Sequence, residues 1–221
     1  MHKHYIVYSH GFGVRKDGRG FLKDIAESMP EFENILFDYN EINEAENTLR
    51  VTPIDQQKNK LLEVIENIKK DDPDAAIDII AHSQGCTIAA LAKPESVRKI
   101  ILIAPPDNTS AQKVMARYVT NKDSEINLQG DSKLKRRDGS TTIVSAAYLQ
   151  SLQGLDNETL FNELPDVAEV IMIKANQDDV VGETTFNNLD SRIKVITIDG
   201  DHNFKLESRQ KVIEVLQKEL I

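Results

Sequence analysis

Short runs of β-branched and apolar residues alternate along this chain with segments whose apolar residues recur every three or four positions. Runs of the first kind are typical of buried strands, and segments of the second kind are typical of helices with one buried face. Strands that alternate regularly with helices belong to a mostly parallel sheet that helices cover on both faces. The sequence therefore predicts an α/β fold. We expect strands at 5–8, 34–37, 75–81, 97–104, 167–175 and 192–199, and helices at 21–29, 53–72, just after 83 and at 206–220.

The alternation stops after Ala104 and resumes near Glu163. Between these points the sequence is more polar, and it predicts one amphipathic helix around Val114 and a β-hairpin that turns at Asp138-Gly139. Because the alternation resumes afterwards, we interpret residues 107 to about 163 as an insertion in a single domain of 221 residues rather than as a second domain. At the start of the helix predicted from residue 53, we expect Thr52 to be the cap and Pro53 the first helical residue.

The chain is acidic, since 36 Asp and Glu residues stand against 27 Lys and Arg residues, for a formal net charge of −9. Such a surface repels phosphate backbones and anionic lipids, so we expect neither nucleic acid nor a membrane as a partner. The single cysteine, Cys86, can form neither an internal disulfide nor, alone, a structural zinc site. An apolar strand is predicted from Tyr5, which leaves no room for a signal peptide. Unless a leader has been removed, we expect a cytoplasmic protein without a metal or a cofactor.

The segment Ala81-His82-Ser83-Gln84-Gly85 joins a predicted strand to a predicted helix. A serine hydroxyl is a weak nucleophile that needs a base, and a sharp strand-to-helix turn lifts it into the open. Small residues must flank such a turn so that neighbouring backbones can approach, and here Ala81 and Gly85 are small. Because serine is also a favoured helix cap, this segment leaves two hypotheses for Ser83, nucleophile and cap.

The segment Ser9-His10-Gly11-Phe12-Gly13 follows the first predicted strand and is rich in glycine. Acyl transfer requires hydrogen-bond donors that are aimed at the oxyanion of the transition state. By position, the backbone N–H groups of Phe12 and Gln84 would form this oxyanion hole, and an ordinary turn is the alternative. The residues expected to support the loop and the serine turn are His10, Gly11, Gly13, His82 and Gly85.

A carboxylate and an imidazole follow two later predicted strands. Asp178 or Asp179 could orient a histidine and stabilise its charged form, and we prefer Asp178 because it comes first after the turn. His202 is the only histidine in the second half of the chain and is the candidate general base. The carboxyl ends of parallel strands meet at one edge of a sheet, so Ser83, Asp178 and His202 should converge there. Their order along the chain, and their placement after strands, predict a serine hydrolase.

Together these motifs resemble those of small members of the α/β-hydrolase superfamily, over nearly the whole chain apart from the insertion. The resemblance implies an α/β-hydrolase fold, a Ser-His-Asp triad, an acyl-enzyme intermediate and a small-molecule ester substrate. Two leading strands of larger members are missing, so we expect a short sheet. The insertion stands where family members carry a lid, and its Arg137-Asp138-Gly139-Ser140 turn and its Tyr148–Leu152 stretch are similar to the small lid of feruloyl and cinnamoyl esterases.

Several alternatives stay open at this point. A thioesterase, a lysophospholipase or a serine aminopeptidase would use the same triad as a carboxylesterase. A non-catalytic ligand-binding protein on this fold would lack a triad residue or an oxyanion glycine, and none is missing here. Dehalogenation would require a carboxylate in place of Ser83. The basic run Lys133–Arg137 is interpreted as the solvated edge of a hairpin, with the steering of a substrate carboxylate or phosphate as the alternative. Cys86 is interpreted as buried packing.

Overall fold

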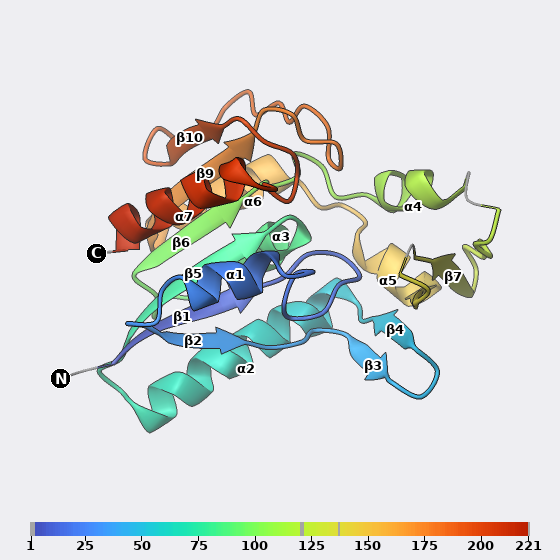
Figure 1. Ribbon diagram of the computed structural model, residues 1–221, viewed down its shortest axis with the longest axis horizontal. Helices are drawn as coiled ribbons and strands as arrows, with labels where there is room; N and C mark the ends of the chain where they lie inside the picture. The colour runs from blue at the N-terminus through green and yellow to red at the C-terminus, as the bar shows by residue number, and fades with distance from the viewer. Residues whose placement is uncertain (1–2, 120–121, 137, 221) are drawn as a thin grey trace.

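The structure is a computed structural model, and it describes residues 3–119, 122–136 and 138–220. Within these residues the central sheet has six strands in the order β10-β9-β6-β5-β1-β2, and every neighbouring pair is parallel. This confirms the mostly parallel sheet that the alternating pattern predicts (Figure 1). The strands are β1 (His4–Ser9), β2 (Glu33–Leu36), β5 (Ala76–His82), β6 (Lys99–Ile103), β9 (Glu169–Ala175) and β10 (Lys194–Ile198).

Helices cover both faces of this sheet. Helices α1 (Phe21–Glu27) and α7 (Glu207–Leu220) pack on one face, where they form a core with alternate strand residues such as Ile6 and Ile80. Helices α2 (Ile54–Asp71) and α3 (Gln84–Ala92) pack on the other face against the intervening residues, which include Val7 and Ile79. Successive side chains of a strand point to opposite faces, so a strand between two helical layers must be apolar throughout. Among the described residues, no helix combines the length and the apolar character that crossing a membrane requires.

The start of α2 differs from the expectation. The helix begins at Ile54, and Pro53 is the residue before its first turn, so the predicted positions of Thr52 and Pro53 are wrong by one residue. The Thr52 hydroxyl does not cap the helix but donates a hydrogen bond to the carbonyl of Tyr39 at 2.9 Å. Instead, the Ser151 hydroxyl oxygen accepts a hydrogen bond from the first helical N–H, that of Ile54, at 3.0 Å. A residue almost one hundred positions away satisfies this donor, which a local pattern cannot reveal.

A second, smaller sheet has the strand order β3-β4-β8-β7 and lies beyond the carboxyl ends of the central strands (Figure 1). Strands β7 (Asp131–Lys135) and β8 (Thr141–Ser145) are antiparallel, which confirms the predicted hairpin. Strands β3 (Glu41–Asn43) and β4 (Thr48–Val51) were not predicted, and β4 pairs with β8 in parallel. Arg137, which belongs to the predicted hairpin and its turn, lies outside the described residues.

The rest of the segment 107–163 is helical in part. It contains α4 (Ala111–Val119), which confirms the predicted amphipathic helix, and the short helices α5 (Ala146–Ser151) and α6 (Asn157–Asn162). A 3-10 turn, η1 (Leu164–Asp166), then leads into β9. Because β8 pairs with β4, this segment shares a sheet with residues that precede it by about ninety positions. Its interpretation as an insertion in a single domain stays a prediction.

Candidate active site

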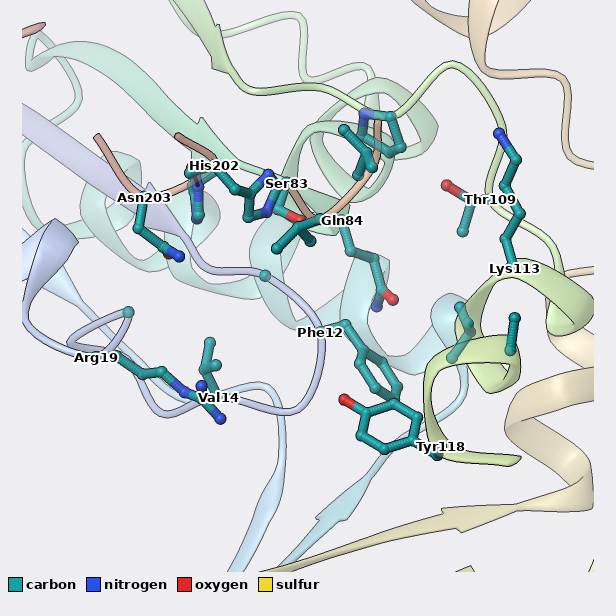
Figure 2. A pocket seen from close by; sticks show the side chains of 18 of the residues that line it. Phe12, Val14, Arg19, Ser83, Gln84, Thr109, Lys113, Tyr118, His202 and Asn203 are labelled. Atoms are coloured by element: carbon teal, nitrogen blue, oxygen red, sulfur yellow. Dashed lines mark hydrogen bonds between the residues drawn. The ribbon is translucent and has the colours of Figure 1, made fainter. Parts of the chain in front are cut away.

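The predicted site residues follow four neighbouring or near-neighbouring strands at the carboxyl edge of the central sheet. Ser83 follows β5, the glycine-rich loop follows β1, and Asp178 and His202 follow β9 and β10. Figure 2 shows Ser83, Gln84 and His202 at one end of a cavity that Phe12 also lines. The volume of this cavity is about 410 Å³. Its wall includes seven of the predicted residues or their neighbours, namely Gly11, Phe12, His82, Ser83, Gln84, His202 and Asn203.

Ser83 lies in a strained turn between β5 and α3. Its φ is 56° and its ψ is −126°, a conformation that residues with a side chain rarely adopt. The turn persists because its backbone is held on both sides: the N–H of Ser83 donates to the carbonyl of Ile103, and the carbonyl of Ser83 accepts from Cys86, both at 2.9 Å. Ser83 occupies the N-cap position of α3, but its hydroxyl makes no capping hydrogen bond, so the side chain does not serve as a helix cap.

Gly85 is required by the same turn. A Cβ atom at this position would lie 2.1 Å from the carbonyl oxygen of Ser9, which is far inside van der Waals contact with backbone. The Ser9 hydroxyl also donates a hydrogen bond to the Gly85 carbonyl at 2.9 Å. The missing side chain therefore lets the loop after β1 lie directly against the serine turn.

The Asp178 carboxylate and the His202 imidazole form a buried pair. Nδ1 of His202 lies 2.7 Å from Oδ2 of Asp178, and both side chains are almost fully buried. Oδ1 of Asp178 accepts hydrogen bonds from the backbone N–H groups of Val180 and Val181, both at 2.8 Å. Burial by itself would raise the pKa of the Asp178 carboxyl, but the hydrogen bond and charge of His202 and the two N–H donors outweigh it and lower this pKa. The carboxylate is therefore ionised at neutral pH.

Asp179, the alternative acid, does not reach the imidazole ring. Its carboxylate accepts a hydrogen bond from the backbone N–H of His202 at 3.4 Å. A donor at Nδ1 of His202 leaves Nε2 as the unprotonated nitrogen, because a neutral imidazole carries only one proton. With Nδ1 bonded to Asp178, Nε2 of His202 is free to act as a base in the cavity that Ser83 lines.

The two other histidines of the site are neutral and support the loops. Nε2 of His82 donates to the carbonyl of His202 at 2.9 Å, and the two rings lie 4.8 Å apart. Burial, together with the neighbouring His202, lowers the pKa of His82 to about 3. Nδ1 of His10 donates to the Gly11 carbonyl, and its Nε2 accepts from the N–H of Tyr39. Burial also lowers the pKa of His10, so neither ring is suited to be the base.

The two residues predicted to form an oxyanion hole, Phe12 and Gln84, belong to segments that adjoin Ser83. Gln84 is the first residue of α3, and an N–H in the first turn of a helix has no acceptor within that helix. Phe12 follows Gly11, where a Cβ atom would lie 3.1 Å from Cβ of Ser83 and 3.5 Å from its Oγ. The loop that carries Phe12 therefore packs against Ser83 itself, and it can do so because Gly11 has no side chain.

The side chain of Gln84 is held by two residues, Gln57 and Tyr148, for which the sequence analysis predicts no role at the serine turn. Its Nε2 donates to Oε1 of Gln57 at 3.2 Å, and its Oε1 accepts from the Tyr148 hydroxyl at 2.5 Å. Burial raises the pKa of the Tyr148 hydroxyl, so it stays protonated and donates. Gln57 offered a signal, since it stands four residues before Leu61 on the buried stripe of its helix. Tyr148 belongs to the stretch that resembles an esterase lid, but nothing in that stretch indicates a contact with Gln84.

The residues from segment 107–163 complete the cavity. Asn108, Thr109, Lys113, Val114 and Tyr118 line it from the side of α4 and the loop before it. Figure 2 shows Thr109 and Lys113 on this side, across the cavity from Arg19 and Val14. Arg136 also lines the cavity, so the interpretation of the basic run as a solvated hairpin edge is wrong for this residue.

Lys133 of the basic run, and Cys86, behave as expected. Lys133 is exposed and pairs with Glu125 at 3.2 Å, as a residue on a solvated edge should. Cys86 is buried, its thiol donates to the Ala81 carbonyl, and burial raises its pKa, which fits packing rather than nucleophilic chemistry. No group of three or more His, Cys, Asp or Glu side chains within the described residues could hold a metal ion.

No family model and no curated protein sequence matches this chain, whereas many solved structures match its fold. The chain is similar to Est1E from Butyrivibrio proteoclasticus with bound ferulic acid, at a TM-score of 0.71 and 18% identity, over 99% of this chain and 88% of that one. It is similar to the esterase domain of a Rhodothermus marinus protein, at 0.66 and 15% identity, over 97% and 85% of the chains. It is also similar to an α/β serine hydrolase homologue from Coxiella burnetii, at 0.63 and 14% identity, over 99% and 85%. The chain therefore has the α/β-hydrolase fold, as the sequence resemblance implies.

Proposed function

We propose that this protein is a serine carboxylic-ester hydrolase in which Ser83, His202 and Asp178 form the catalytic triad. The observation that carries the proposal is the buried Asp178–His202 pair beside the strained Ser83 turn, at the edge of one cavity. Each group has the property that its role requires: an ionised carboxylate, an imidazole with an unprotonated Nε2, and a hydroxyl that does not cap a helix.

The reaction follows from these positions. Nε2 of His202 takes the proton from Oγ of Ser83 as this oxygen attacks the ester carbonyl carbon, and the carbonyl oxygen becomes an oxyanion. The backbone N–H groups of Phe12 and Gln84 donate hydrogen bonds to that oxyanion. His202 then gives its proton to the departing alcohol, which leaves an acyl group on Ser83. A water molecule, deprotonated by His202, hydrolyses the acyl-enzyme and releases the acid.

Asp178 stabilises the charged imidazolium that forms twice in each cycle. The N–H groups of Val180 and Val181 stabilise the carboxylate and fix its orientation toward Nδ1 of His202. His82 anchors the backbone of His202 through its carbonyl, so the base is held from both its ring and its main chain. These contacts favour a catalytic protein over one that only binds a ligand, because ligand binding alone does not require a stabilised and oriented base.

The remaining expectations are part of this proposal. We take segment 107–163 as a lid, since α4 and the loop before it form one wall of the cavity. The partner would be a small-molecule ester, with neither nucleic acid nor a membrane involved, and the location would be the cytoplasm. A thioester, a lysophospholipid or a peptide amide remains the alternative substrate. The ferulic acid bound to Est1E makes hydroxycinnamate esters a reasonable class to include in a substrate panel.

The first experiment is active-site labelling with a fluorophosphonate probe, which reacts with activated serines. The wild type should be labelled and Ser83→Ala should not, while Ser191→Ala, which removes an exposed serine, should label like the wild type. The same three proteins would be assayed on p-nitrophenyl esters of increasing acyl length, methyl hydroxycinnamates and an acyl thioester. A folded wild type that takes up no probe, or equal labelling of Ser83→Ala, would refute the proposal.

A further inference from the structure

Arg136 lies where the active-site cavity meets a second, larger one. The second cavity has a volume of about 980 Å³. The two cavities adjoin each other, since they share six lining residues, and together we call them the hollow beside Ser83: Val14, Arg19, Tyr118, Arg136, Val180 and Asn203.

The contacts of the Arg136 guanidinium are all uncharged. Nε donates to Oγ1 of Thr142 at 2.8 Å, Nη1 donates to the Tyr118 hydroxyl, and Nη2 donates to the carbonyl of Gly13 at 3.4 Å. The guanidinium carbon also lies 5.0 Å from the ring centre of Tyr118 and 5.7 Å from that of Phe12. A guanidinium has five N–H donors, so one on each Nη has no acceptor among the described residues.

Arg136 also has no carboxylate partner within the part of the chain that the structure describes. The charge of Asp138 is close enough to raise the pKa of Arg136, but the two side chains form no ion pair, because Oδ1 of Asp138 accepts from the N–H and the hydroxyl of Ser140, at 3.0 and 2.6 Å. Burial lowers the pKa of Arg136, yet a guanidinium stays charged at any physiological pH. A partly buried guanidinium that makes no direct ion pair is unfavourable, and an anionic ligand would relieve this.

The lining of the second cavity is cationic in a protein that is acidic overall. Six of its residues are Lys or Arg, against the acids Asp17, Asp138 and Asp179. Arg15, Arg209 and Lys205 pair with carboxylates, those of Glu44, Asp24 and Asp201. The Lys135 ammonium donates a hydrogen bond to the Thr141 hydroxyl at 2.9 Å. Arg19 forms no ion pair within the described residues, and Figure 2 shows it on the cavity wall beside Val14. Arg19 and Arg136 are therefore the two cations of this hollow that are available to a ligand.

We propose that the ester substrate carries an anionic group, a carboxylate or a phosphate, that binds Arg136 with the help of Arg19. This rests on the proposed function, since it specifies the substrate of the same serine site. The two unused donors of Arg136, one on each Nη, suit the paired oxygens of a carboxylate or a phosphate. Phe12 lies between the guanidinium and the Ser83 turn, so the anion binds on the oxyanion-loop side of the nucleophile.

A purely structural role for Arg136 is the competing explanation, because its hydrogen bonds tie the β7–β8 hairpin to the loop at Gly13. The two explanations differ in one measurable quantity, the ratio of kcat/KM for an anionic ester to kcat/KM for its neutral counterpart. Loss of a structural tie lowers both values and leaves the ratio unchanged, whereas loss of an anion-binding group lowers the ratio.

The test uses two matched pairs of esters. Monomethyl adipate and methyl hexanoate differ by a carboxylate on the acyl group, and 1-butyrylglycerol 3-phosphate and 1-butyrylglycerol differ by a phosphate on the alcohol. Acid release is followed by pH-stat titration at low salt for the wild type, Arg136→Gln and Lys133→Gln. Lys133→Gln is the matched control, because it removes the same charge from the same hairpin, three residues before Arg136, at a residue that lines neither cavity.

In the wild type we expect one pair to show a ratio of about 10 to 100, which is the range of a charge-assisted hydrogen bond. Arg136→Gln should reduce this ratio to near 1, and Lys133→Gln should keep it. Whichever pair responds identifies the anion as a carboxylate or a phosphate. If Arg136→Gln does not fold, Arg19→Gln, at an exposed position, should lower the same ratio by a smaller factor.

A ratio near 1 for both pairs in the wild type, or a ratio that Arg136→Gln leaves unchanged, would overturn the inference. If the wild type hydrolyses none of the esters, calorimetric titration of Ser83→Ala with the anionic esters tests the anion site independently of hydrolysis. Binding that disappears in Ser83→Ala/Arg136→Gln would support the anion site and refute the proposed hydrolysis. Absence of binding to Ser83→Ala would overturn the anion site.

Discussion

Replacing Asp178 by Asn should reduce kcat about 10⁴-fold, whereas Asp179→Asn should change it by less than about threefold. An asparagine at 178 keeps one oxygen, and the N–H groups of Val180 and Val181 require that oxygen as their acceptor. Its amide nitrogen then faces Nδ1 of His202 at the present 2.7 Å and donates to it. The imidazole proton moves to Nε2, which can no longer accept the proton of Ser83.

The expected loss of kcat follows from this change of the His202 tautomer. A 10⁴-fold loss corresponds to about 5.4 kcal/mol of transition-state stabilisation, at about 1.36 kcal/mol for each factor of ten. Asp179 accepts only from a backbone N–H at 3.4 Å, and an asparagine oxygen can accept the same bond. The adjacent aspartates thus provide a matched pair with the same change of charge and size.

The assay is steady-state hydrolysis of p-nitrophenyl butyrate at pH 7.5 by the wild type, Asp178→Asn and Asp179→Asn. Thermal unfolding of each protein would show that the variants are folded. The reasoning would be refuted if Asp178→Asn kept more than a tenth of the wild-type kcat, or if Asp179→Asn lost as much activity as Asp178→Asn.

Three further predictions concern the surroundings of the triad. Because the pKa of His82 is about 3 in the folded protein and about 6.5 when unfolded, its contribution to stability is present above pH 6.5 and is lost as the pH falls toward 3. Urea unfolding should therefore show a slope with pH between 6.5 and 4 that is shallower in His82→Gln, by at most about 1.4 kcal/mol per pH unit, and parallel slopes would contradict this. Gly85→Ala places a Cβ atom 2.1 Å from the Ser9 carbonyl oxygen, so it should destabilise the protein by about 3 kcal/mol or more in urea unfolding, and a loss below about 1 kcal/mol would be inconsistent with the packing. Tyr148→Phe removes a buried hydrogen bond to Gln84 and should lower kcat about 3- to 30-fold with an unchanged fold by circular dichroism, whereas unchanged kcat would show that this bond does not position the oxyanion hole.

Much of the fold and of the triad could be predicted from local sequence. Buried parallel strands must be apolar and their helices amphipathic, so both produce patterns that can be recognised without knowing which segments pack together. Ser83, Asp178 and His202 could be selected because each follows such a strand, and parallel strands bring their carboxyl ends to one edge. The sequence left open which of the two adjacent aspartates faces His202. This choice depends on the loop after β9, in which the N–H groups of Val180 and Val181 bind the Asp178 carboxylate.

Other features follow only from contacts between distant segments. The β3–β4 hairpin was not predicted, because it is short and β4 pairs with β8, a strand about ninety residues later. The cap of α2 comes from Ser151, and the support of Gln84 comes from Tyr148. In each case the hydrogen-bond partner lies far away along the chain, and no local pattern links it to the group that it satisfies.

Arg136 shows most clearly the difference between what local sequence predicts and what tertiary packing decides. The basic run Lys133–Arg137 is one pattern in the sequence, but Lys133 lies in β7 and faces solvent, because successive residues of a strand face opposite sides. Arg136 follows the end of this strand and extends toward Gly13 and the active-site cavity. Local composition specified which elements form and which residues could carry serine chemistry, because periodicity and chain order are properties of neighbouring positions. The shape and charge of the cavity, and with them the substrate, depend on packing between segments far apart in the chain.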